Sequence, residues 1–526
     1  MKEYTIKISR YNPEVDKKPT IKDYRVPNTD QGTVLEALLY VYEEIDSELL
    51  FSYGCRYKLC GKCAIKINGK PALGCETPLK EGMILEPLDQ FPVIRDLAVD
   101  RSGLIEPLRK HHILFVSSKE LEEVVIQPPE FFQAIKCNEC LACLSNCPVF
   151  SQGLDYDGPF FGVKLAELYY DVRDGEDRIR ELESYSEKCI LCKRCDGDCP
   201  WGVNFSELST KIKGELYGRR RSSIRDWIFS HPSFVGNFET FLFPFSNFLV
   251  KQKPFRKMLG RFVGIHEKAF LPEYHPGRIR KWQKKESRKK RKVAYFLGCF
   301  DKFNDPVTAE DSISIMEANN ITIEAIDLGC CGLPFIGVGN LQSAENRAVE
   351  VSKKLKKLLT DGYDILLSCP SCGSMIRNLY PRLFHQMMEE KIQKRIHDIG
   401  EYLLEMVRSD QLNANFKRIE KKIGYHVPCH LKSQEMGTPF VDLLNLIPGL
   451  KIDEVFDQCC GMAGTMGLKK EKYEFSRKVG GPLISLIEKG KFDLILSDCA
   501  SCRMRIESEA EVKTSHSISI LKESMK

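Results

Sequence analysis

The cysteines are the residues of this chain whose number and spacing carry the most chemistry. The sequence has 22 of them, and all belong to groups with regular spacing. The first nine residues alternate like a strand and lack the basic and then apolar layout of a secretory signal. We therefore expect the protein to be cytoplasmic and its thiols to stay reduced. In such a compartment, dense cysteines at fixed spacing indicate metal ligation rather than disulfides.

The first group has the C-x4-C-x2-C…C spacing of a plant-type 2Fe-2S cluster. Its predicted ligands are Cys55, Cys60, Cys63 and Cys75. Soft anionic thiolates suit ferric iron and bridging sulfide. Gly54 and Gly61 let the loop wrap closely around the cluster. A structural zinc site is the alternative, since four cysteines also satisfy zinc.

The second group is the run C-x2-C-x2-C-x3-C-P, which occurs twice. In two-cluster ferredoxins the fourth cysteine of each run binds the other cluster. One predicted 4Fe-4S ligand set is therefore Cys137, Cys140, Cys143 and Cys199, and the other is Cys189, Cys192, Cys195 and Cys147. A zinc site would explain neither the prolines nor the shared spacing.

The third group is a repeat in which one cysteine is followed by Cys-Cys-Gly and then by Cys-x2-Cys. The two sets are Cys299, Cys330, Cys331, Cys369, Cys372 and Cys429, Cys459, Cys460, Cys499, Cys502, offset by 129 or 130 positions. Five thiolates exceed the four of tetrahedral zinc. They also exceed the needs of a plain cubane, so the sequence predicts an irregular iron-sulfur cluster in each half. Buried structural thiols are the alternative.

The elements that must position these cysteines follow from the alternation of apolar residues. Residues 4–9 and 63–68 are predicted strands and 34–44 a helix, and the pattern becomes helical beyond about residue 100. In the repeats, strands are predicted at 293–297, 321–327, 364–367, 423–427, 452–456 and 492–496, with helices such as 344–359 between them. Each half is thus βαβαβ, a parallel-sheet pattern, with its cysteines just past the carboxyl ends of strands, where such sheets bind ligands.

The chain is predicted to be multidomain, with α+β and α/β parts. The expected parts are a 2Fe-2S domain at 1–100, a two-cubane domain at 101–225, a helical connector with a basic linker at 226–292, and Cys-Cys-Gly domains at 293–422 and 423–526. The linker, 278–292, has ten Lys or Arg in 15 residues and is interpreted as solvated rather than as an anion or RNA site.

Charge and hydropathy argue against two kinds of partner. The net charge of +5, from 78 Lys and Arg against 73 Asp and Glu, is too small to indicate nucleic-acid binding. The most apolar uncharged stretch, 240–250, contains Pro244 and is far shorter than the roughly 20 residues of a spanning helix. A buried helix is predicted there in preference to an interfacial one, and no membrane partner is expected.

The first 225 residues resemble the iron-sulfur subunit of succinate dehydrogenases and fumarate reductases. The resemblance is carried by Arg10 to Glu14, the loop from Cys55 to Cys75, the two ferredoxin runs, Gly158-Pro159 and Asp171 to Asp174. It implies a β-grasp 2Fe-2S domain, an α-helical two-cubane domain and a partner subunit that carries FAD. The chain departs from the quinone-linked members at two places. Those members lack a cysteine at the position of Cys192, and they have tryptophans where this chain has Val149 to Gln152.

Residues 293–526 resemble the catalytic subunit of heterodisulfide reductase. The matching motifs are Phe296 to Cys299, Cys330 to Pro334, His426 to His430 and Cys459 to Gly461. The resemblance implies two noncubane 4Fe-4S clusters that make or break the mixed disulfide of coenzyme M and coenzyme B. His430 has the chemistry of a proton relay but equally that of a structural histidine.

Along its whole length the chain resembles the iron-sulfur subunit of the thiol-dependent fumarate reductases of methanogens. This implies oxidation of coenzyme M and coenzyme B thiols, and electron transfer to a flavoprotein that reduces fumarate to succinate. One alternative is a quinone-linked succinate dehydrogenase or fumarate reductase subunit, with Phe234 to Phe262 as its only membrane foothold. The other is an electron-transfer subunit of a different flavin dehydrogenase.

Overall fold

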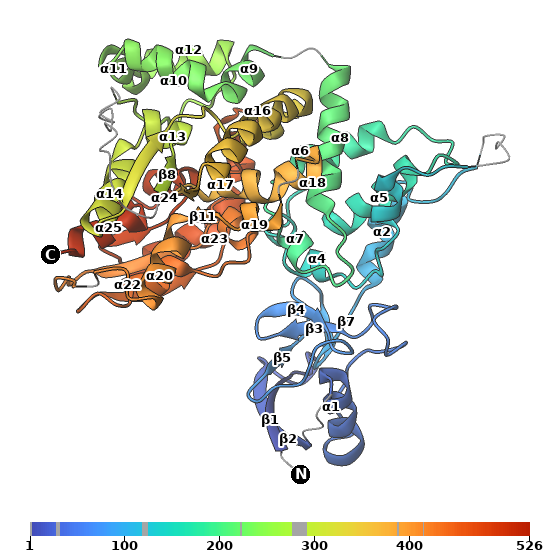
Figure 1. Cartoon of the computed structure of the whole chain (residues 1–526). Coiled ribbons are helices and arrows are strands. Elements are labelled where there is room, and N and C mark those ends of the chain that lie inside the picture. Colours follow the sequence, from blue (N-terminus) through green and yellow to red (C-terminus); the bar gives the residue numbers. More distant parts are fainter. Residues whose placement is uncertain are drawn as a thin grey trace. The chain divides into compact units, whose positions relative to one another are not determined.

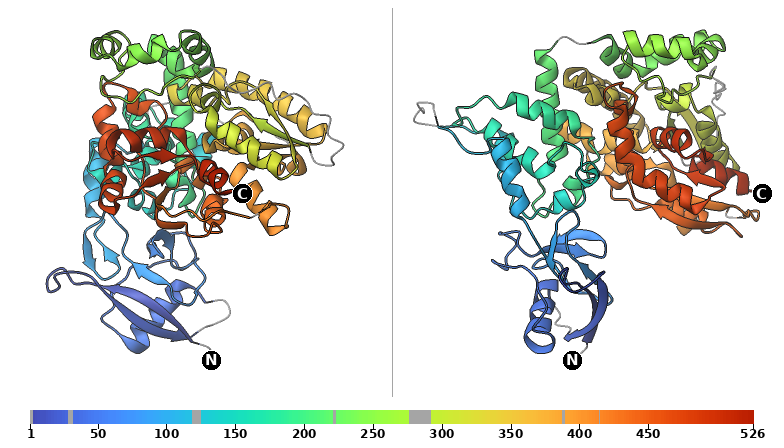
Figure 2. Two further views of the ribbon diagram at one scale, coloured as in Figure 1. Left: turned by 90° about the vertical axis from the view of Figure 1, so that its left-hand side faces the viewer. Right: turned by 180° about the vertical axis from the view of Figure 1, so that it is seen from behind.

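The computed structural model describes residues 3–27, 32–117, 125–220, 223–275, 292–386, 389–413 and 415–526. The chain divides into two compact units, Met1–Lys213 (unit 1) and Gly214–Lys526 (unit 2), shown in Figures 1 and 2. The division falls within helix α8 (Phe205–Arg219). The predicted basic linker lies outside the described residues except for Lys292, so its interpretation stays a prediction.

Unit 1 begins with a five-stranded sheet of order β2-β1-β5-β3-β4. Strand β1 pairs antiparallel with β2 and parallel with β5. The elements of this part are β1 (Glu3–Arg10), β2 (Thr20–Pro27), α1 (Val34–Tyr40), η1 (Val41–Ile45), β3 (Ala64–Ile67), β4 (Lys70–Leu73), β5 (Ile84–Glu86), β6 (Val93–Arg95) and β7 (Ala98–Val99). Thr33 and Glu36 form a capping box that starts α1. The helix buries Leu38 against Ile6, Ile8 and Leu85 of the sheet, so the predicted strands and helix are confirmed.

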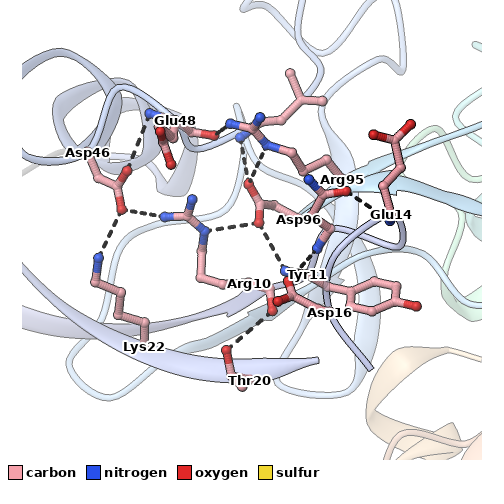
Figure 3. A network of polar contacts seen from close by, with 12 residues as sticks. Arg10, Tyr11, Glu14, Asp16, Thr20, Lys22, Asp46, Glu48, Arg95 and Asp96 are labelled. Atoms are coloured by element: carbon pink, nitrogen blue, oxygen red, sulfur yellow. Dashed lines mark hydrogen bonds and ion pairs between the residues drawn. The ribbon is translucent and has the colours of Figure 1, made fainter. Parts of the chain in front are cut away.

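A half-buried arginine ties three segments of this small domain together (Figure 3). Arg10 donates from Nε to Asp96 at 3.0 Å and also pairs with Asp46. Asp46 accepts further hydrogen bonds from Tyr24 (2.7 Å) and Lys22 (3.0 Å). Burial alone would raise the pKa of Asp46, but these donors together hold it well below its usual range. The network fixes β1 and β2 to the segments that flank the cysteine loop.

The rest of unit 1 is helical, as predicted. Its elements are η2 (Ser102–Leu104), α2 (Ile105–Lys110), α3 (Pro129–Ala134), α4 (Ala142–Ser145), η3 (Phe150–Gln152), α5 (Pro159–Tyr170), α6 (Ile179–Lys188), α7 (Arg194–Gly197) and α8. The short helices α4 and α7 lie within the two ferredoxin runs. Gly158 has φ +101°, and a Cβ there would meet Leu144 at 2.2 Å, so only glycine lets α5 start this close to the first run.

Unit 2 holds two four-stranded parallel sheets of matching topology, with orders β11-β10-β8-β9 and β13-β12-β14-β15. The strands are β8 (Lys292–Phe296), β9 (Thr322–Ile326), β10 (Tyr363–Leu367), β11 (Ile396–Asp398), β12 (Lys422–His426), β13 (Lys451–Phe456), β14 (Leu494–Leu496) and β15 (Thr514–Ser515). All six predicted strands are present. Each half adds a fourth strand, β11 or β15, which is too short to show an alternating pattern.

Helices cover both sheets, and the two halves share a buried cluster. They are α13 (Cys299–Phe303), α14 (Pro306–Ala318), α15 (Leu333–Val338), α16 (Leu341–Thr360), α17 (Pro370–Gly373), η4 (Ser374–Leu379), α18 (Tyr380–Phe384), α19 (Glu390–Gln393), α20 (Ile399–Arg408), α21 (Cys429–Lys432), α22 (Pro439–Leu444), η5 (Met466–Leu468), α23 (Tyr473–Gly490), α24 (Ala500–Glu509) and α25 (Ser517–Ser524). Tyr295 and Tyr402 of the first half pack in the same buried cluster as Tyr425 and Phe440 of the second.

The connector between the ferredoxin runs and the repeats contradicts one prediction. It forms four helices, α9 (Ile224–Ser230), α10 (Pro232–Phe241), α11 (Phe245–Lys251) and α12 (Lys253–Phe262). The predicted buried helix over 240–250 is wrong, because the stretch is split at Pro244 and its phenylalanines point outward. Phe241 is 85% exposed and Phe248 60%. The apolar composition of the stretch led to the prediction that its side chains are buried. In the structure, small or polar residues such as Gly236 of α10 and Asn247 of α11 face the protein interior instead.

A buried acid in unit 2 generates a prediction about pH. Asp398 ends β11 and caps α20, accepting a hydrogen bond from the Gly400 N–H at 2.8 Å. Burial, with the nearby charge of Asp498, raises the pKa of Asp398 to about 8. An unfolded aspartate has a pKa of about 4, so between these values the folded state holds a proton that the unfolded state has released. The free energy of unfolding must therefore fall as pH rises through this window.

We expect Asp398→Asn, which keeps the cap and removes the titration, to flatten this fall in stability. The measurement is the thermal unfolding midpoint, recorded anaerobically from pH about 5 to about 9. Asp361→Asn, at an exposed position in the same unit, is the matched control. A midpoint that falls equally steeply in Asp398→Asn and in the wild type would contradict the assignment.

Candidate iron-sulfur cluster sites

The loop before β3 points backbone N–H groups at its cysteine sulfurs. The N–H of Cys55 donates to Cys60 Sγ at 3.3 Å, and that of Cys60 to Cys55 Sγ at 3.2 Å. The N–H of Lys58 donates to Cys75 Sγ at 3.2 Å. Hydrogen bonds from Tyr57 and Cys60 lower the pKa of Cys55 to about 7. A loop of this kind favours the thiolate form, which iron requires.

The same loop touches the first ferredoxin run directly. Gly61 has φ +64°, and a Cβ there would lie 2.6 Å from the carbonyl oxygen of Asn138 and 2.7 Å from Cys140 Cα. The side chains of Asn138 and Trp201 both donate to the carbonyl oxygen of Lys58, at 2.9 and 3.0 Å. Within unit 1, the 2Fe-2S loop and the first 4Fe-4S loop are therefore in backbone contact. The sequence predicted that Gly61 lets its own loop wrap around the cluster. In the structure, the close contact with Asn138 and Cys140 is the stronger reason why position 61 must be glycine.

Two cavities collect the eight cysteines of the ferredoxin runs. One is lined by Cys137, Cys140, Cys143 and Cys199, and also by Cys195. The other is lined by Cys147, Cys189, Cys192 and Cys195. Each therefore contains one of the crossed sets that the spacing predicts, although the assignment of ligands stays a prediction. Pro159 and Phe205 line both cavities, so the two lie side by side.

The buried thiols of these cavities require positive charge to ionise. Burial raises the pKa of Cys143 and Cys195 well above the usual value, and that of Cys147 to about 12. A bound cation reverses this penalty, since metal binding displaces the thiol proton. Within the described ranges, no three or more His, Cys, Asp or Glu side chains form a ready single-ion site. The fit to 4Fe-4S clusters rests instead on the two cavity linings and the thiolate chemistry.

One cation near these sulfurs was not found from the sequence. Arg101 is half-buried, and its charged neighbours are the thiols of Cys140, Cys60 and Cys63. Burial lowers the pKa of Arg101, but a guanidinium remains protonated at neutral pH. Arg101 thus places a positive charge beside both the 2Fe-2S loop and the first cavity. A lone arginine outside any motif gives no signal in a single sequence.

In the first Cys-Cys-Gly half, five thiols form a continuous chain of contacts. Neighbours along it are Cys299, Cys330, Cys331, Cys372 and Cys369. Cys299 follows β8, Cys330 and Cys331 follow β9, and Cys369 and Cys372 follow β10, which confirms that these cysteines lie past the carboxyl ends of the strands. The neighbouring Cys299 thiol holds the pKa of Cys330 well below its usual value, whereas the shared hydrogen bonds raise the pKa of Cys331 and Cys372. Thiols that share charge in this way suit a common multi-iron ligand set.

The second half repeats part of this arrangement. Cys460 Sγ lies 3.2 Å from Cys502 Sγ, which also contacts Cys499. The Gly461 N–H donates to Cys459 Sγ at 3.3 Å, as the Gly332 N–H donates to Cys330 Sγ at 3.4 Å in the first half. Cys429 begins α21 directly after β12. The hydrogen bond from Cys502 lowers the pKa of Cys499 to about 6.

Contacts across the shared core bring the two repeats together. Ser371, inside the Cys369 to Cys372 loop, has its Oγ 2.8 Å from His430 Nδ1 and 4.0 Å from Cys499 Sγ. Gln434 donates to the carbonyl oxygen of Pro370 at 3.1 Å. A second contact between the halves is a 2.8 Å ion pair between Arg503 and Asp305. Arg503 is next to Cys502, and Asp305 lies just after helix α13, which begins at Cys299. The two five-thiol sets therefore belong to one site region.

Arg347 is a second residue that was not predicted from the sequence. It donates from Nε to the carbonyl oxygen of Cys330 at 2.7 Å, and it also holds the carbonyl oxygen of Leu328. The internal repeat could have drawn attention to Arg347, because another arginine, Arg477, stands 130 positions later, at the offset of the repeat. Arg477 instead donates to Glu509 at 2.9 Å, so the two halves use this arginine differently.

Three family models match the chain. A 2Fe-2S iron-sulfur cluster binding domain covers residues 5–106 and a 4Fe-4S dicluster domain covers 133–203. A cysteine-rich domain matches twice, at 293–377 and 423–507. These matches confirm the multidomain layout with its internal duplication.

Whole proteins match over most of the chain. An uncharacterized iron-sulfur protein of Methanocaldococcus jannaschii is 30% identical over 513 residues, covering 95% of this chain and 93% of that protein. The chain belongs to the family of this archaeal iron-sulfur protein. A subunit of the fumarate reductase (CoM/CoB) of Methanothermobacter marburgensis is 27% identical over 522 residues, covering 96% and 95% of the two chains. The predicted resemblance is confirmed.

A third relative belongs to another oxidoreductase. One subunit of the anaerobic glycerol-3-phosphate dehydrogenase of Escherichia coli K12 is 29% identical over 399 residues, covering 74% of this chain and 98% of that protein. Members of this family of iron-sulfur proteins are thus related to subunits of oxidoreductases, and this chain is an iron-sulfur electron-transfer protein of that kind. In the described part of the chain, no helix has the length and hydropathy to cross a bilayer.

The position of Arg101 generates a prediction about redox potential. We expect Arg101→Gln to lower the potentials of the 2Fe-2S cluster and its 4Fe-4S neighbour, because the reduced, more negative state loses a nearby cation. A lost interaction of about 1 to 2 kcal/mol corresponds to about 40 to 90 mV for a one-electron couple. The measurement is a redox titration followed by electron paramagnetic resonance.

Arg101→Lys should retain most of the wild-type potential. Arg25→Gln removes the same charge from an exposed position on β2 and serves as the matched control. Equal shifts in Arg101→Gln and Arg25→Gln would show that net charge, and not the position of Arg101, sets the potential.

Proposed function

We propose that this chain is the iron-sulfur subunit of a cytoplasmic fumarate reductase driven by thiols. Coenzyme M and coenzyme B would be oxidised at the duplicated domain to their mixed disulfide, releasing two protons and two electrons. The electrons would pass to FAD on a flavoprotein partner, where fumarate takes up two electrons and two protons to become succinate. The similarity to the fumarate reductase (CoM/CoB) relative over 96% of the chain supports this proposal.

The chain's own residues would hold five clusters that supply one-electron transfer when bound. The four-cysteine loop would hold the 2Fe-2S cluster, and the two crossed sets the 4Fe-4S clusters. The two five-cysteine sets would each hold a noncubane 4Fe-4S cluster. Backbone N–H groups aimed at Cys55, Cys60 and Cys75 would stabilise sulfur charge, and the backbone contact at Gly61 would keep the transfer distance short.

The observation that carries the proposal is the approach of the two five-thiol sets. Ser371 of the first repeat lies within 4.0 Å of Cys499 and 2.8 Å of His430, both from the second repeat. A reaction that joins two different thiols needs two thiol sites close together, held in fixed orientation. A duplicated domain with complete ligand sets in both halves meets that need. One degraded set would have suited a purely electron-conducting role better.

The relative from glycerol-3-phosphate dehydrogenase defines the competing function. That protein matches over 98% of its own length but leaves a quarter of this chain uncovered, since the match spans 74%. The fumarate reductase relative leaves only 4% uncovered, because its match spans 96%. The fuller match favours the thiol-dependent reaction over electron transfer from glycerol phosphate, lactate or glycolate.

The decisive experiment offers alternative electron donors to the anaerobic complex of this chain with its flavoprotein. Coenzyme M plus coenzyme B, a menaquinol, or glycerol 3-phosphate is supplied as sole donor, and succinate is measured. We expect the thiol pair alone to drive succinate formation. Cys369→Ala and Cys499→Ala should abolish that reaction, while oxidation of a reduced viologen dye by fumarate, which tests only the flavin, should continue.

Succinate formation from menaquinol with inert thiols would replace the proposal with a quinone-linked enzyme. Dehydrogenation of glycerol phosphate without fumarate reduction would replace it with the competing electron-transfer function. Loss of both thiol- and dye-driven activity in a cysteine variant would mean that the variant disrupts the whole complex. Cluster content by iron and sulfide analysis then identifies which variants remain intact.

A further inference from the structure

The connector helices of unit 2 expose an unusual number of aromatic side chains. Helices α9 to α12 lie together along one side of this unit (Figures 1 and 2). The exposed phenylalanines of α10 to α12 are Phe234 (59%), Phe238 (55%), Phe241 (85%), Phe245 (60%), Phe248 (60%) and Phe262 (76%). Single exposed apolar residues are ordinary, but six exposed phenylalanines on three consecutive helices indicate a contact surface. We call these six residues the phenylalanine face.

Helix α10 presents its phenylalanines outward and a small residue inward. On α10, Phe234, Phe238 and Phe241 follow helical spacing and form one outward stripe. The inward position, Gly236, packs so closely on α13 that a Cβ would meet the Phe303 ring at 2.4 Å. This close packing fixes which side of α10 faces outward.

Helix α11 shows this arrangement more clearly. Its buried residues are polar, Ser246 and Asn247, while Phe245 and Phe248 are exposed. The Asn247 side chain donates to the carbonyl oxygen of Tyr274 at 2.7 Å and accepts from the Tyr274 N–H at 2.9 Å. These hydrogen bonds lock the polar residues inside. A helix that met only water would place its phenylalanines inward, so the outer face suits an apolar environment.

Positive charge accompanies the phenylalanine face. From residue 232 to 262 the sequence has five basic residues, Lys251, Lys253, Arg256, Lys257 and Arg261, and one acidic residue, Glu239. Lys251 pairs with Glu273 at 2.6 Å, and Arg256 binds backbone carbonyl oxygens. Lys253, Lys257 and Arg261, all on α12 and exposed, make no ion pair with the described residues. Three cations thus remain available on the helix that also carries Phe262.

We propose that the phenylalanine face and the cations of α12 bind the surface of an anionic lipid bilayer. Exposed aromatic and aliphatic side chains beside Lys and Arg are the features of helices that lie in a membrane interface, and anionic lipid attracts such basic segments. Phenylalanine and arginine suit a protein interface as well as a lipid one, but two of the three available cations are lysines, which are depleted in protein–protein interfaces, and this favours lipid. The expectation of no membrane contact rested on the length needed to span a bilayer, which peripheral binding does not require. The proposal holds whichever donor supplies electrons.

The test is co-sedimentation of the full cluster-loaded chain with vesicles. One set of vesicles is pure phosphatidylcholine and the other contains phosphatidylglycerol. We expect binding to the anionic vesicles, weaker binding to the neutral ones, and partial release by high salt as lysine and arginine contacts are screened. The double variant Phe241→Ser with Phe248→Ser should lose binding to both. Lys257→Glu with Arg261→Glu should lose the preference for anionic lipid.

Phe132→Ser is the matched control, since Phe132 is similarly exposed (53%) but belongs to α3 of unit 1. Cluster absorbance and circular dichroism establish that each variant is folded. Equal vesicle binding by the Phe241→Ser, Phe248→Ser variant and the wild type would overturn the proposal. The proposal would also be overturned if the wild-type protein did not bind vesicles and instead used the phenylalanine face to form a dimer or to bind its flavoprotein. In that case the Phe241→Ser, Phe248→Ser variant would lose dimerisation or flavoprotein binding.

Discussion

The candidate cluster sites depend on one electrostatic constraint, which is that burial disfavours the ionised form of a thiol unless hydrogen bonds or positive charge compensate it. Cys143, Cys195, Cys299 and Cys372 lie where burial or neighbouring thiols push the pKa upward. A bound iron-sulfur cluster would supply this compensation, and folding and cluster binding would then be thermodynamically linked. The protein around them supplies the remainder, through backbone N–H groups, helix N-termini after parallel strands, and single cations such as Arg101.

The cysteine loops must also pack closely against neighbouring backbone, and glycine allows this at a few positions. At Gly61 it lets the 2Fe-2S loop touch Cys140, and at Gly461, with φ +76°, it lets the Cys-Cys-Gly loop lie against α23, where a Cβ would meet the carbonyl oxygen of Ser476 at 2.2 Å. Any side chain at these positions would separate groups that must be near each other. The spacing of cysteines along the chain works only because these contacts hold the loops in place.

Prediction from sequence succeeded where the chemistry repeats along the chain. The ferredoxin runs, the Cys-Cys-Gly offset and the six strands of the repeats could all be predicted, because each leaves a periodic signal. It failed where a feature depends on three-dimensional context. The strands β11 and β15 are too short for a pattern, and Arg101 and Arg347 act through neighbours distant in sequence. The stretch from 240 to 250 was predicted to be buried because composition does not say which side of a helix faces the protein.

The two halves of the duplicated domain share a buried cluster, in which Tyr295 and Tyr402 pack with Tyr425 and Phe440. A gene duplication that ends in a shared core cannot be undone by deleting one copy, because each half would expose the apolar surface that its twin now covers. The two copies are therefore retained together even when selection acts on only one of them. Divergence between the two halves also reaches the surroundings of their cysteine loops, as the different roles of Arg347 and Arg477 illustrate.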